Sequence, residues 1–335
     1  MTKLAILSDS HLSPDNTELI ENLFNEFCTY CVKNKINTAW HIGDFFEQRF
    51  GQPLNVLKSA KRILKLFTEN NIHLNIVVGN HDKPNYDLED SFLDLFSDYK
   101  MVTIHNDFKT IENEGYSVTT MPYFSTKIFN EKAKSISRPK NDFNVCMVHQ
   151  GIDGAVNQSY VVENSISEKT FDKFDLTLCG HYHNRHFIGD NIFYIGSIRP
   201  KDFGEDEEKG FIVLDNKTKN IQTVPLTFKQ YHTIHIYSNM NEDIFKRNIK
   251  SAKSLVKKHF VRVMFEGDKS FFTEHRNDLE NLGIKTVYKN SNSSIPNTYT
   301  NISLKKGDKN SLLNEFEKFC KKEKYDFEFG KQFIK

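Results

Sequence analysis

The first 80 residues alternate between short apolar runs and longer segments whose apolar residues recur every three or four positions. The short runs at 3–7, 38–42 and 72–78 are typical of buried strands. The segments 15–33 and 56–69 between them have the spacing of amphipathic helices, and Pro14 and Asp15 open the first one. This alternation predicts βαβ units, in which helices cover a largely parallel sheet.

From about residue 101 to 230 the apolar runs continue, but the helical spacing between them disappears. Seven further strands are predicted, at 101–105, 116–121, 144–149, 176–179, 191–195, 211–214 and 221–226. Strands joined without helices favour antiparallel pairing. We therefore expect a second, more antiparallel sheet that packs on the first one.

A smaller unit follows at about residue 230. The pattern there predicts a strand at 231–237, a helix at 241–258, a strand at 260–265 and a helix at 270–282. The polar stretch 290–300 is typical of a linker, and a last helix is expected at 309–322. We thus divide the chain into a main domain (1–230), a small α+β module (231–300) and a C-terminal helical segment (301–335).

The charge of the chain changes at the same boundary. Residues 1–230 carry 25 Lys and Arg against 31 Asp and Glu, whereas residues 231–335 carry 20 against 13. An acidic main domain is compatible with a cation-binding enzyme. A basic module, with its lysine-rich helix at 241–258, suits contact with a polyanion or simply a solvated surface.

The cysteines and the apolar runs bear on where the protein works. Five scattered cysteines do not form a disulfide framework, and Cys28 and Cys31 fall on the apolar stripe of a predicted helix. No run of about 18 apolar residues occurs, and the apolar run at the N-terminus is too short for a signal peptide. We therefore expect a cytoplasmic protein with no membrane association and with core cysteines at 28 and 31.

Polar residues that suit a divalent metal follow five of the predicted strands. They are Asp9-Ser10-His11, Gly43-Asp44, Gly79-Asn80-His81-Asp82, His149 and Gly180-His181-Tyr182-His183. In open α/β sheets the carboxyl ends of the strands line one crevice, so these groups should converge. Carboxylates, imidazoles and an amide oxygen form a mixed set that accepts Mn²⁺, Fe²⁺ or Zn²⁺. The spacing by two in Asp9-x-His11 would direct both side chains the same way in an extended segment.

The series D-x-H, GD, GNHD, H and GHxH resembles the signature of the calcineurin-like metallophosphoesterases. The resemblance implies a four-layer α/β/β/α sandwich and two metal ions, most simply Mn²⁺, with Mg²⁺ or Fe²⁺ as alternatives. It also implies two ligand sets that share one bridging aspartate. The first set is Asp9, His11, Asp44 and His183, and the second is Asp44, Asn80, His149 and His181.

A closer resemblance covers residues 191–210, NIFYIGSIRPKDFGEDEEKG. This stretch is similar to the Tyr-x-Gly-Ser…Arg…Phe-x-Glu…Glu-Lys-Gly pattern of SbcD-type double-strand-break repair nucleases, and GDFFEQR at 43–49 also resembles their sequences. It adds Ser197, Arg199 and Arg49 to the candidate site. Some relatives carry a second catalytic histidine where this chain has Glu47. Glu47 either takes over a supporting role beside the metals or orients Arg49.

The resemblance implies the chemistry of a metal-dependent phosphodiester hydrolase. Two metals lower the pKa of a shared water to near 7, so that a hydroxide is available at neutral pH. His81 is then the main catalytic histidine, and Asp82 is expected to orient it through the other ring nitrogen. The implied activity is a DNA nuclease of recombination and repair, acting as a duplex exonuclease and a single-strand endonuclease.

An alternative is a small-molecule hydrolase of the same superfamily, such as a cyclic-nucleotide phosphodiesterase or a phosphatase. Protein phosphatases of the superfamily carry GNHE with GDxVDRG, whereas this chain has GNHD with GDFFEQR. That difference disfavours the phosphatases, and a compact cyclic-nucleotide enzyme would not need the basic module.

The C-terminal segment predicts a partner. Its apolar residues Leu312, Leu313, Phe316, Phe319 and Cys320 fall on one face of the expected helix. In SbcD-type nucleases a C-terminal helical segment binds the coiled coil of the ATPase. The resemblance thus implies an SbcC-type ABC ATPase partner and a homodimer of this chain within a heterotetramer, besides DNA. The alternative is that the helix folds back on the main domain.

Overall fold

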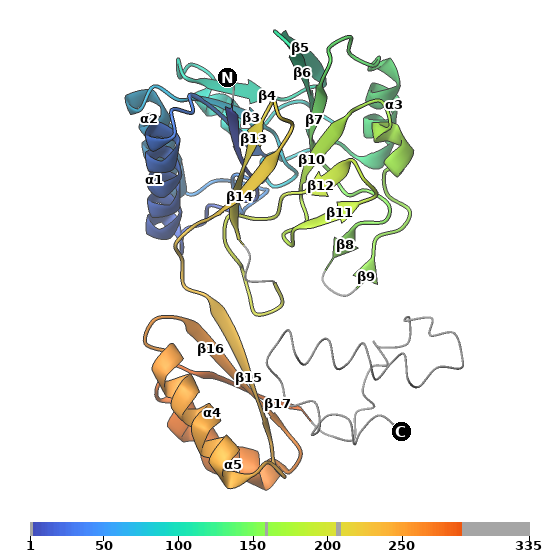
Figure 1. Cartoon of the computed structure of the whole chain (residues 1–335). Helices are drawn as coiled ribbons and strands as arrows, with labels where there is room; N and C mark the ends of the chain where they lie inside the picture. The colour runs from blue at the N-terminus through green and yellow to red at the C-terminus, as the bar shows by residue number, and fades with distance from the viewer. Residues whose placement is uncertain (1–2, 158–159, 206–208, 290–335) are drawn as a thin grey trace, which may run out of the picture.

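A six-stranded mixed sheet forms the first half of the main domain. The computed structural model of the protein describes residues 3–157, 160–205 and 209–289. The strands lie in the order β14 (Ile221–Pro225), β13 (Gly210–Asp215), β1 (Lys3–Leu7), β2 (Thr38–Ile42), β3 (His73–Val77) and β4 (Val102–His105). The four strands β1 to β4 are parallel, as the βαβ pattern predicts, and β13 and β14 add antiparallel strands at one edge. Helices α1 (Thr17–Lys33) and α2 (Leu54–Glu69) cover the outer face of this sheet (Figure 1).

A second six-stranded sheet packs on the first. Its order is β11 (His186–Ile188), β12 (Ile192–Tyr194), β10 (Leu176–Gly180), β7 (Asn144–His149), β6 (Tyr116–Met121) and β5 (Lys109–Asn113). Helix α3 (Thr126–Ser135) and the short helix η2 (Glu168–Phe171) lie on its outer face, and a second short helix, η1 (Phe92–Phe96), precedes β4. The two-residue strands β8 (Val156–Asn157) and β9 (Tyr160–Val161) pair in a loop beyond β7.

Three apolar cores separate these layers. Strand β1 contributes to two of them, because alternate side chains of a strand point to opposite faces. Leu4 and Ile6 lie between the two sheets, whereas Ala5 and Leu7 face α1 and α2. The third core, around Phe129 and Phe171, lies between the second sheet and α3. The order helix, sheet, sheet, helix is the expected four-layer α/β/β/α sandwich.

Two expectations for residues 101–230 are wrong. The segment is not one sheet, because β4, β13 and β14 join the first sheet. The second sheet is also no more antiparallel than the first, since β6, β7, β10 and β12 run parallel to one another. Parallel neighbours need crossover connections, and α3 supplies one of them between β6 and β7. Helix α3 has only two buried residues, Phe129 and Ala133, so its apolar periodicity is weak.

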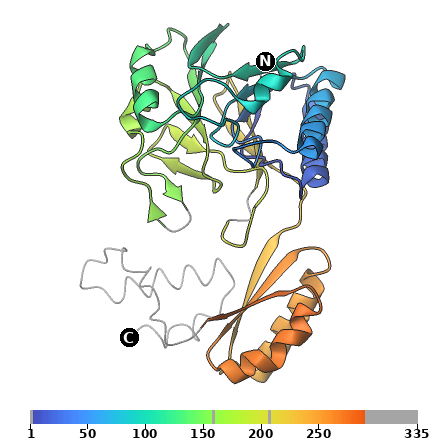
Figure 2. The same ribbon diagram turned by 180° about the vertical axis from the view of Figure 1, so that it is seen from behind.

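The module after residue 230 is a separate βαβαβ unit. Its three strands, β15 (Tyr231–Tyr237), β16 (Phe260–Glu266) and β17 (Lys285–Lys289), are parallel. Helices α4 (Glu242–Leu255) and α5 (Lys269–Glu280) begin at capping residues Asn241 and Asp268, whose side chains accept a backbone N–H. Both helices pack on one face of the sheet around a core of its own (Figures 1 and 2). The core residues include Ile236, Val261, Val263, Phe265 and Leu279.

The other face of the module's sheet contacts the main domain. The Arg262 guanidinium lies 4.7 Å from the ring centre of Phe203, and the Lys285 ammonium lies 5.9 Å from it. The Phe203 ring also meets the edge of Tyr231, with ring centres 4.9 Å apart. Phe203 belongs to the segment 199–205, which we call the connecting loop. The module thus touches the main domain through an aromatic and cationic cluster on this loop.

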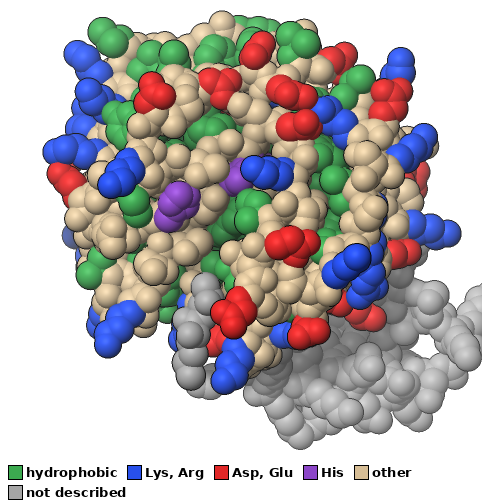
Figure 3. Space-filling view, turned by 90° about the horizontal axis from the view of Figure 1, so that it is seen from above, with side chains coloured by type: hydrophobic (Ala, Val, Ile, Leu, Met, Phe, Trp, Pro, Cys, Tyr) green, Lys and Arg blue, Asp and Glu red, His purple; other side chains and the backbone are tan. Residues whose placement is uncertain are grey.

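The structure leaves two predicted C-terminal elements undescribed. The predicted linker at 290–300 and the helix at 309–322 lie outside the described residues. No helix within the described ranges has the length and apolar character needed to cross a membrane. On the face of the main domain that points away from the module, acidic and basic side chains are interspersed (Figure 3).

Candidate metal centre

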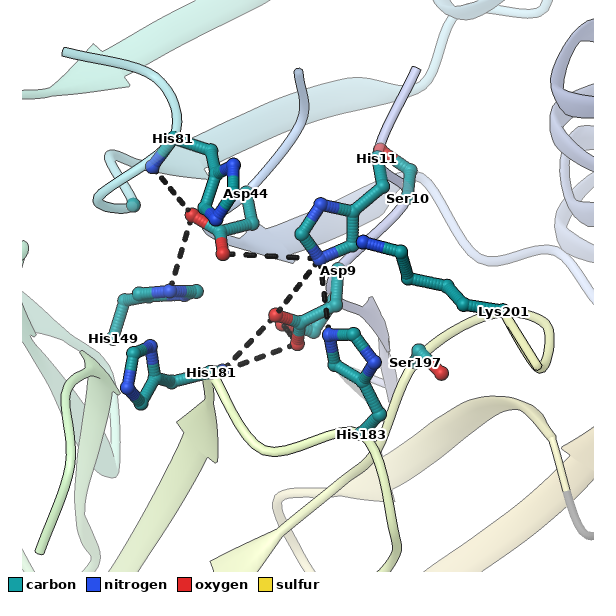
Figure 4. Close-up of polar contacts among 12 residues, drawn as sticks. Asp9, Ser10, His11, Asp44, His81, His149, His181, His183, Ser197 and Lys201 are labelled. Atoms are coloured by element: carbon teal, nitrogen blue, oxygen red, sulfur yellow. Dashed lines mark hydrogen bonds and ion pairs between the residues drawn. The ribbon is translucent and has the colours of Figure 1, made fainter. Parts of the chain in front are cut away.

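The carboxyl ends of strands from both sheets meet at one place. Asp9 and His11 follow β1, Asp44 follows β2, His149 ends β7, and His181 and His183 follow β10. Their side chains point toward one another in Figure 4. The sequence groups therefore converge, as strand ends of packed α/β sheets should.

The backbone at these residues is not extended. Asp9, His11, Asp44 and His181 have φ angles of 53°, 48°, 54° and 95°, in the left-handed region that residues other than glycine rarely adopt. The expectation that an extended Asp9-x-His11 segment directs both side chains the same way is thus wrong. Left-handed turns at both residues direct them inward instead. Such strained positions persist where the surrounding structure holds them, and they concentrate at functional sites.

One cluster gathers Asp9, His11 and His183. The Nε2 atoms of His11 and His183 are 3.0 Å apart, and Asp9 Oδ1 lies 3.9 Å from His11 Nε2. Asp9 also accepts the backbone N–H of His181 and the hydroxyl of Ser8. All three residues offer a ligand atom within 4.8 Å of the others.

A second cluster gathers Asp44, His149 and His181. Asn80 joins it, because its Oδ1 lies 3.1 Å from His149 Nε2 and 3.0 Å from His181 Nδ1. Asp44 faces both clusters: its Oδ1 is 3.2 Å from His149 Nε2 and its Oδ2 is 3.8 Å from His11 Nε2. Asp44 therefore places one carboxylate oxygen near a histidine ring of each cluster.

The donor chemistry of these clusters fits two divalent metal ions. Each cluster combines carboxylate oxygens with imidazole nitrogens, which is the set that first-row divalent metals accept. The two ring nitrogens of His11 and His183 point at each other, and a cation between them satisfies both. A single proton, in contrast, can be shared by only one such pair of ring nitrogens at a time.

Burial and neighbouring charges shift the pKa values of the clustered groups. Burial alone would raise the pKa of Asp44, but His149, His11 and His81 hold it well below its usual range. Burial lowers the pKa of His181 to about 4, so this imidazole is neutral and free to bind a cation. Burial opposes protonation of His149 too, yet Asp44 raises its pKa to about 9. Binding of a metal at Asp44 would therefore release a proton from His149.

Two carboxylates hold the outer nitrogens of the histidines. Glu47 Oε2 lies 2.9 Å from His11 Nδ1, and Glu205 Oε1 lies 2.7 Å from His183 Nδ1. Each carboxylate is paired in turn with a lysine: Lys201 with Glu47 at 2.8 Å, and Lys209 with Glu205 at 3.0 Å. Burial works against ionisation, but these partners lower the pKa of both carboxyls to about 2. Such carboxylate–histidine pairs fix the ring orientation and the tautomer of a metal ligand.

Glu205 and Lys201 are members of the site that sequence reasoning did not assign. Both lie in the connecting loop, which the Phe-x-Glu pattern at 203–205 marks in the sequence. For Glu47, the supporting role is the alternative that fits, since it contacts His11 and Lys201. Arg49 lies instead over the ring of Tyr86, with its guanidinium carbon 4.1 Å from the ring centre.

His81 lies over the clusters but is not oriented as expected. Its backbone N–H donates to Asp44 Oδ1 at 2.9 Å, and its ring meets the edge of His11 at 5.0 Å between centres. Its Nδ1 donates to the backbone carbonyl of Glu47. Because that nitrogen is bonded to Glu47, the prediction that Asp82 orients the His81 ring is wrong.

Asp82 supports the backbone instead. Its carboxylate accepts the backbone N–H groups of Phe46 and Gly79, each at 2.9 Å. The side chain is fully buried, and burial and the nearby Asp44 raise its pKa to about 6. Asp82 thus ties the turn after β2 to the turn after β3.

The glycines of the motif allow close backbone approach. A Cβ atom on Gly79 would lie 2.2 Å from the backbone nitrogen of Asp44, and one on Gly180 would lie 2.1 Å from the carbonyl oxygen of Ile42. That carbonyl also bonds His149 Nδ1 at 2.8 Å. Without side chains at 79 and 180, the strand ends can come together tightly enough to form the clusters.

Ser197 and Arg199 lie beside the site without reaching the ligand clusters. The Ser197 hydroxyl donates to the Arg199 carbonyl at 2.8 Å and lies 3.4 Å from Glu205 Oε2. Arg199 donates to the Pro200 carbonyl and lines a hollow between the start of α1 and the module. A second hollow, of about 290 Å³, opens beside the clusters and is lined by His181, His183, Lys201 and Glu205 among others.

Known proteins resemble the chain over this region and beyond it. Residues 2–185 match the family model described as calcineurin-like phosphoesterase. Exonuclease subunit 1 of Enterobacteria phage T4 is 21% identical over 286 residues, which cover 80% of this chain and 84% of that protein. The DNA double-strand break repair protein Mre11 of Methanocaldococcus jannaschii is 28% identical over 62% of this chain and 61% of its own length. A subunit of the nuclease SbcCD of Staphylococcus saprophyticus is 23% identical over 82% and 80%, respectively.

Proposed function

This chain belongs to the calcineurin-like phosphoesterase family, and we propose that within it the chain is a metal-dependent DNA nuclease of recombination and repair. The observation that carries this proposal is Asp44, whose two oxygens face two separate ligand clusters at the converging strand ends. The similar proteins support DNA as the substrate, since their names describe an exonuclease subunit, a double-strand break repair protein and a nuclease subunit. The proposed activities are those of a duplex exonuclease and a single-strand endonuclease.

The residues divide into ligands and supports. We assign Asp9, His11, Asp44 and His183 to one metal and Asp44, Asn80, His149 and His181 to the other. When bound, two divalent ions lower the pKa of a water molecule and neutralise charge on the phosphate oxygens. Glu47 and Glu205 hold His11 and His183 so that the Nε2 atom of each ring points into the site.

His81 is the residue assigned to proton movement. A backbone carbonyl only accepts hydrogen bonds, so His81 Nδ1 carries a proton and Nε2 is the atom left to act on the substrate. An imidazolium at this place would donate from Nε2 to the departing oxygen or stabilise its charge. Because its backbone is held by Asp44 and its ring by Glu47, the position of His81 does not depend on a bound metal, and we assign it no metal.

The first experiment tests the substrate. Purified protein with Mn²⁺ is incubated with linear duplex DNA, single-stranded DNA, a cyclic nucleotide and a chromogenic phosphodiester. We expect cleavage of both DNAs, and loss of it with EDTA. Cleavage of the cyclic nucleotide without any cleavage of DNA would instead support the small-molecule phosphodiesterase.

The second experiment separates catalysis from metal binding. His81→Asn should reduce DNA hydrolysis at least about a hundredfold, as loss of a general acid does, while calorimetry still detects two Mn²⁺ per chain. Asp44→Ala should lose metal binding as well. His73→Asn is a matched control, because His73 lies at the start of β3, the strand that precedes the turn with His81, and its side chain bonds Thr103. Near-wild-type turnover of His81→Asn would remove His81 from the mechanism.

We also propose that the chain is one component of a complex with an SbcC-type ABC ATPase, as a homodimer within a heterotetramer. The names of two similar proteins describe them as subunits. The contact proposed is the C-terminal segment 301–335, which lies outside the described residues. Phe316→Glu with Phe319→Glu should abolish co-purification with the ATPase and leave the nuclease activity of the isolated chain intact. Unfolding or loss of that activity would favour a helix packed on the main domain.

We base the proposed cytoplasmic location on the state of the cysteines. The four described cysteines, Cys28, Cys31, Cys146 and Cys179, are buried thiols. Burial raises the pKa of Cys31 to about 12, as expected for a core residue of α1 rather than a metal ligand. Thiols of this kind suit a reducing compartment.

A further inference from the structure

A row of rings runs outward from the second ligand cluster. The ring centres of His181 and Tyr123 are 5.9 Å apart, and those of Tyr123 and Tyr86 are 4.9 Å apart. The Arg49 guanidinium carbon then lies 4.1 Å from the Tyr86 ring centre and 5.4 Å from that of Phe50. The row therefore starts at a proposed metal ligand and ends at Phe50.

The end of this row is open. Phe50 is 86% exposed, which is high for so large an apolar side chain in a well-packed domain. It lies on the wall of an open hollow of about 670 Å³ that residues 47–53 line. The free face of Phe50 can thus take a flat ring without any movement of the core.

Arg49 brings an uncommitted positive charge to the same hollow. No carboxylate of the described residues lies within ion-pair distance of its guanidinium, whereas the nearby Lys201 is paired with Glu47 at 2.8 Å. The Arg49 guanidinium is held by stacking on Tyr86. A guanidinium placed in this way can both stack with a base and attract a phosphate.

The hollow begins at the residue that holds His81. Glu47 lines it and bonds the His81 ring through its backbone carbonyl. A nucleotide strand with its scissile phosphate at the metal clusters and its departing oxygen at His81 would therefore have its next nucleoside beside residues 49 and 50. An aromatic face, a stacked guanidinium and a neighbouring phosphodiester site together fit a nucleotide better than they fit a peptide or a lipid.

We propose that Arg49, Phe50 and Tyr86 form a shelf on which one unstacked nucleobase of the DNA strand lies next to the scissile phosphate. The ligand class is a nucleobase of any identity, because aromatic stacking uses the face that all bases share. The inference rests on the proposed nuclease function. It adds that the substrate strand at the site is unpaired at that position, whether it comes from single-stranded DNA or from a frayed duplex end.

The test uses a base whose fluorescence reports stacking. A single-stranded oligonucleotide with a terminal 2-aminopurine is titrated with the full-length His81→Asn protein in Mn²⁺, so that binding is measured without cleavage. We expect quenching on binding. In the same background, Phe50→Ala should restore the fluorescence and weaken binding about tenfold, which corresponds to ~1.4 kcal/mol. Phe50→Trp should keep the quenching.

Two controls isolate the base. Leu54→Ala removes another exposed apolar side chain, 67% exposed, at the start of α2, and it should bind like the parent. An oligonucleotide with an abasic terminal position should bind the parent and Phe50→Ala equally. Equal effects of Phe50→Ala on the base and abasic oligonucleotides, or no quenching by the parent, would overturn the shelf.

The outcome is distinct from failure of the proposed function. If wild-type protein cleaves DNA but Phe50→Ala changes neither fluorescence nor affinity, only the shelf is wrong. If wild-type protein cleaves no DNA, the nuclease proposal is wrong, and quenching that depends on Phe50 would then indicate a nucleotide site of another kind.

Discussion

At the scale of single residues, Asp82 links the stability of the fold to the metal site. Its buried carboxylate accepts two backbone N–H groups, so Asp82→Ala should leave both donors without a partner. We expect the free energy of unfolding of the metal-free protein to fall by about 3 kcal/mol. Chemical denaturation in EDTA measures this, with the exposed Asp98→Ala as the control. A loss of turnover with unchanged stability would mean that Asp82 acts on His81 after all.

His105 predicts a pH dependence of stability away from the metal site. Burial lowers its pKa to about 4, and its ring stacks on Trp40 and bonds Asn75. The unfolded chain binds a proton near pH 6.5, whereas the folded chain does not until about pH 4. The stability is therefore complete above pH 6.5 and decreases as the pH falls toward 4, by about 2 kcal/mol at about pH 5.

Urea denaturation of metal-free protein at about pH 7.5 and about pH 5 measures that decrease. His105→Gln cannot titrate there, so its stability should fall by about 2 kcal/mol less than that of the wild type over the same interval. Comparing the two proteins cancels the contribution of other buried histidines such as His41. Identical pH profiles would show that His105 does not titrate in this range.

The residues that converge at the candidate metal centre could be picked out from the sequence, but the groups that support them could not. The proposed ligands stand out because metal-binding residue types follow apolar strands in a recognisable order; they are Asp9, His11, Asp44, Asn80, His149, His181 and His183. The partners of their outer nitrogens come from distant parts of the chain. Glu205 follows His183 by 22 positions and meets it only because the connecting loop returns to the site. No local spacing in the sequence predicts such a contact.

At the scale of elements, long periodic segments were predictable and sheet membership was not. The limits of β1, β2, β6 and β7 agree with the predicted strands. In β1 and β7 the interior of the strand is a continuous apolar sequence, as is usual for strands buried on both faces. Helix α3 was not predicted, since its surface is mostly polar. Which sheet β4 and β13 join depends on crossovers over the whole domain, and apolar patterning within a strand does not encode it.

The turns after β2 and β3 provide a prediction at this scale. Gly79→Ala would place a Cβ 2.3 Å from Asp44 Oδ1, so the two turns must separate. Because Asp44 faces both clusters, we expect affinity for both metal ions to fall at least about tenfold, or ~1.4 kcal/mol each. Calorimetry with Mn²⁺ measures this. Gly51→Ala is the control, because nothing lies within 4 Å of the added atom, and wild-type affinity in Gly79→Ala would contradict the expected crowding.

At the scale of the whole molecule, the basic charge of the module could be predicted from the sequence. Which face of the module lies toward the main domain could not. The lysine-rich helix α4 packs on the sheet face opposite to Arg262 and Lys285, which contact Phe203 of the main domain. If the chain acts on DNA as proposed, the strand face toward the connecting loop, and not α4, is the side of the module from which basic residues would meet it. Sequence patterning marked α4 as amphipathic and basic without indicating this orientation.

For the proposed nuclease, this arrangement predicts which charges of the module would contact DNA. Lys285→Glu should weaken duplex binding and reduce the slope of log affinity against log salt by about 1, as loss of one phosphate contact does. Lys250→Glu with Lys253→Glu on α4 is the control and should change the slope less. Hydrolysis of a small chromogenic diester checks that the metal site is intact. A larger effect from the α4 pair would place the DNA on the helical side.

The connecting loop has a thermodynamic consequence. One loop carries Phe203, which packs on the module, Lys201, which pairs with the Glu47 carboxylate beside His11, and Glu205, which contacts His183 directly. If the position of the module alters that loop, then metal affinity and module docking are linked, and linkage is reciprocal. Loading the site with Mn²⁺ should then slow hydrogen exchange in β15 and β16, although neither strand contributes a ligand. Phe203→Ala should uncouple the module from the metal site, so that hydrogen exchange in the module no longer responds to the metal.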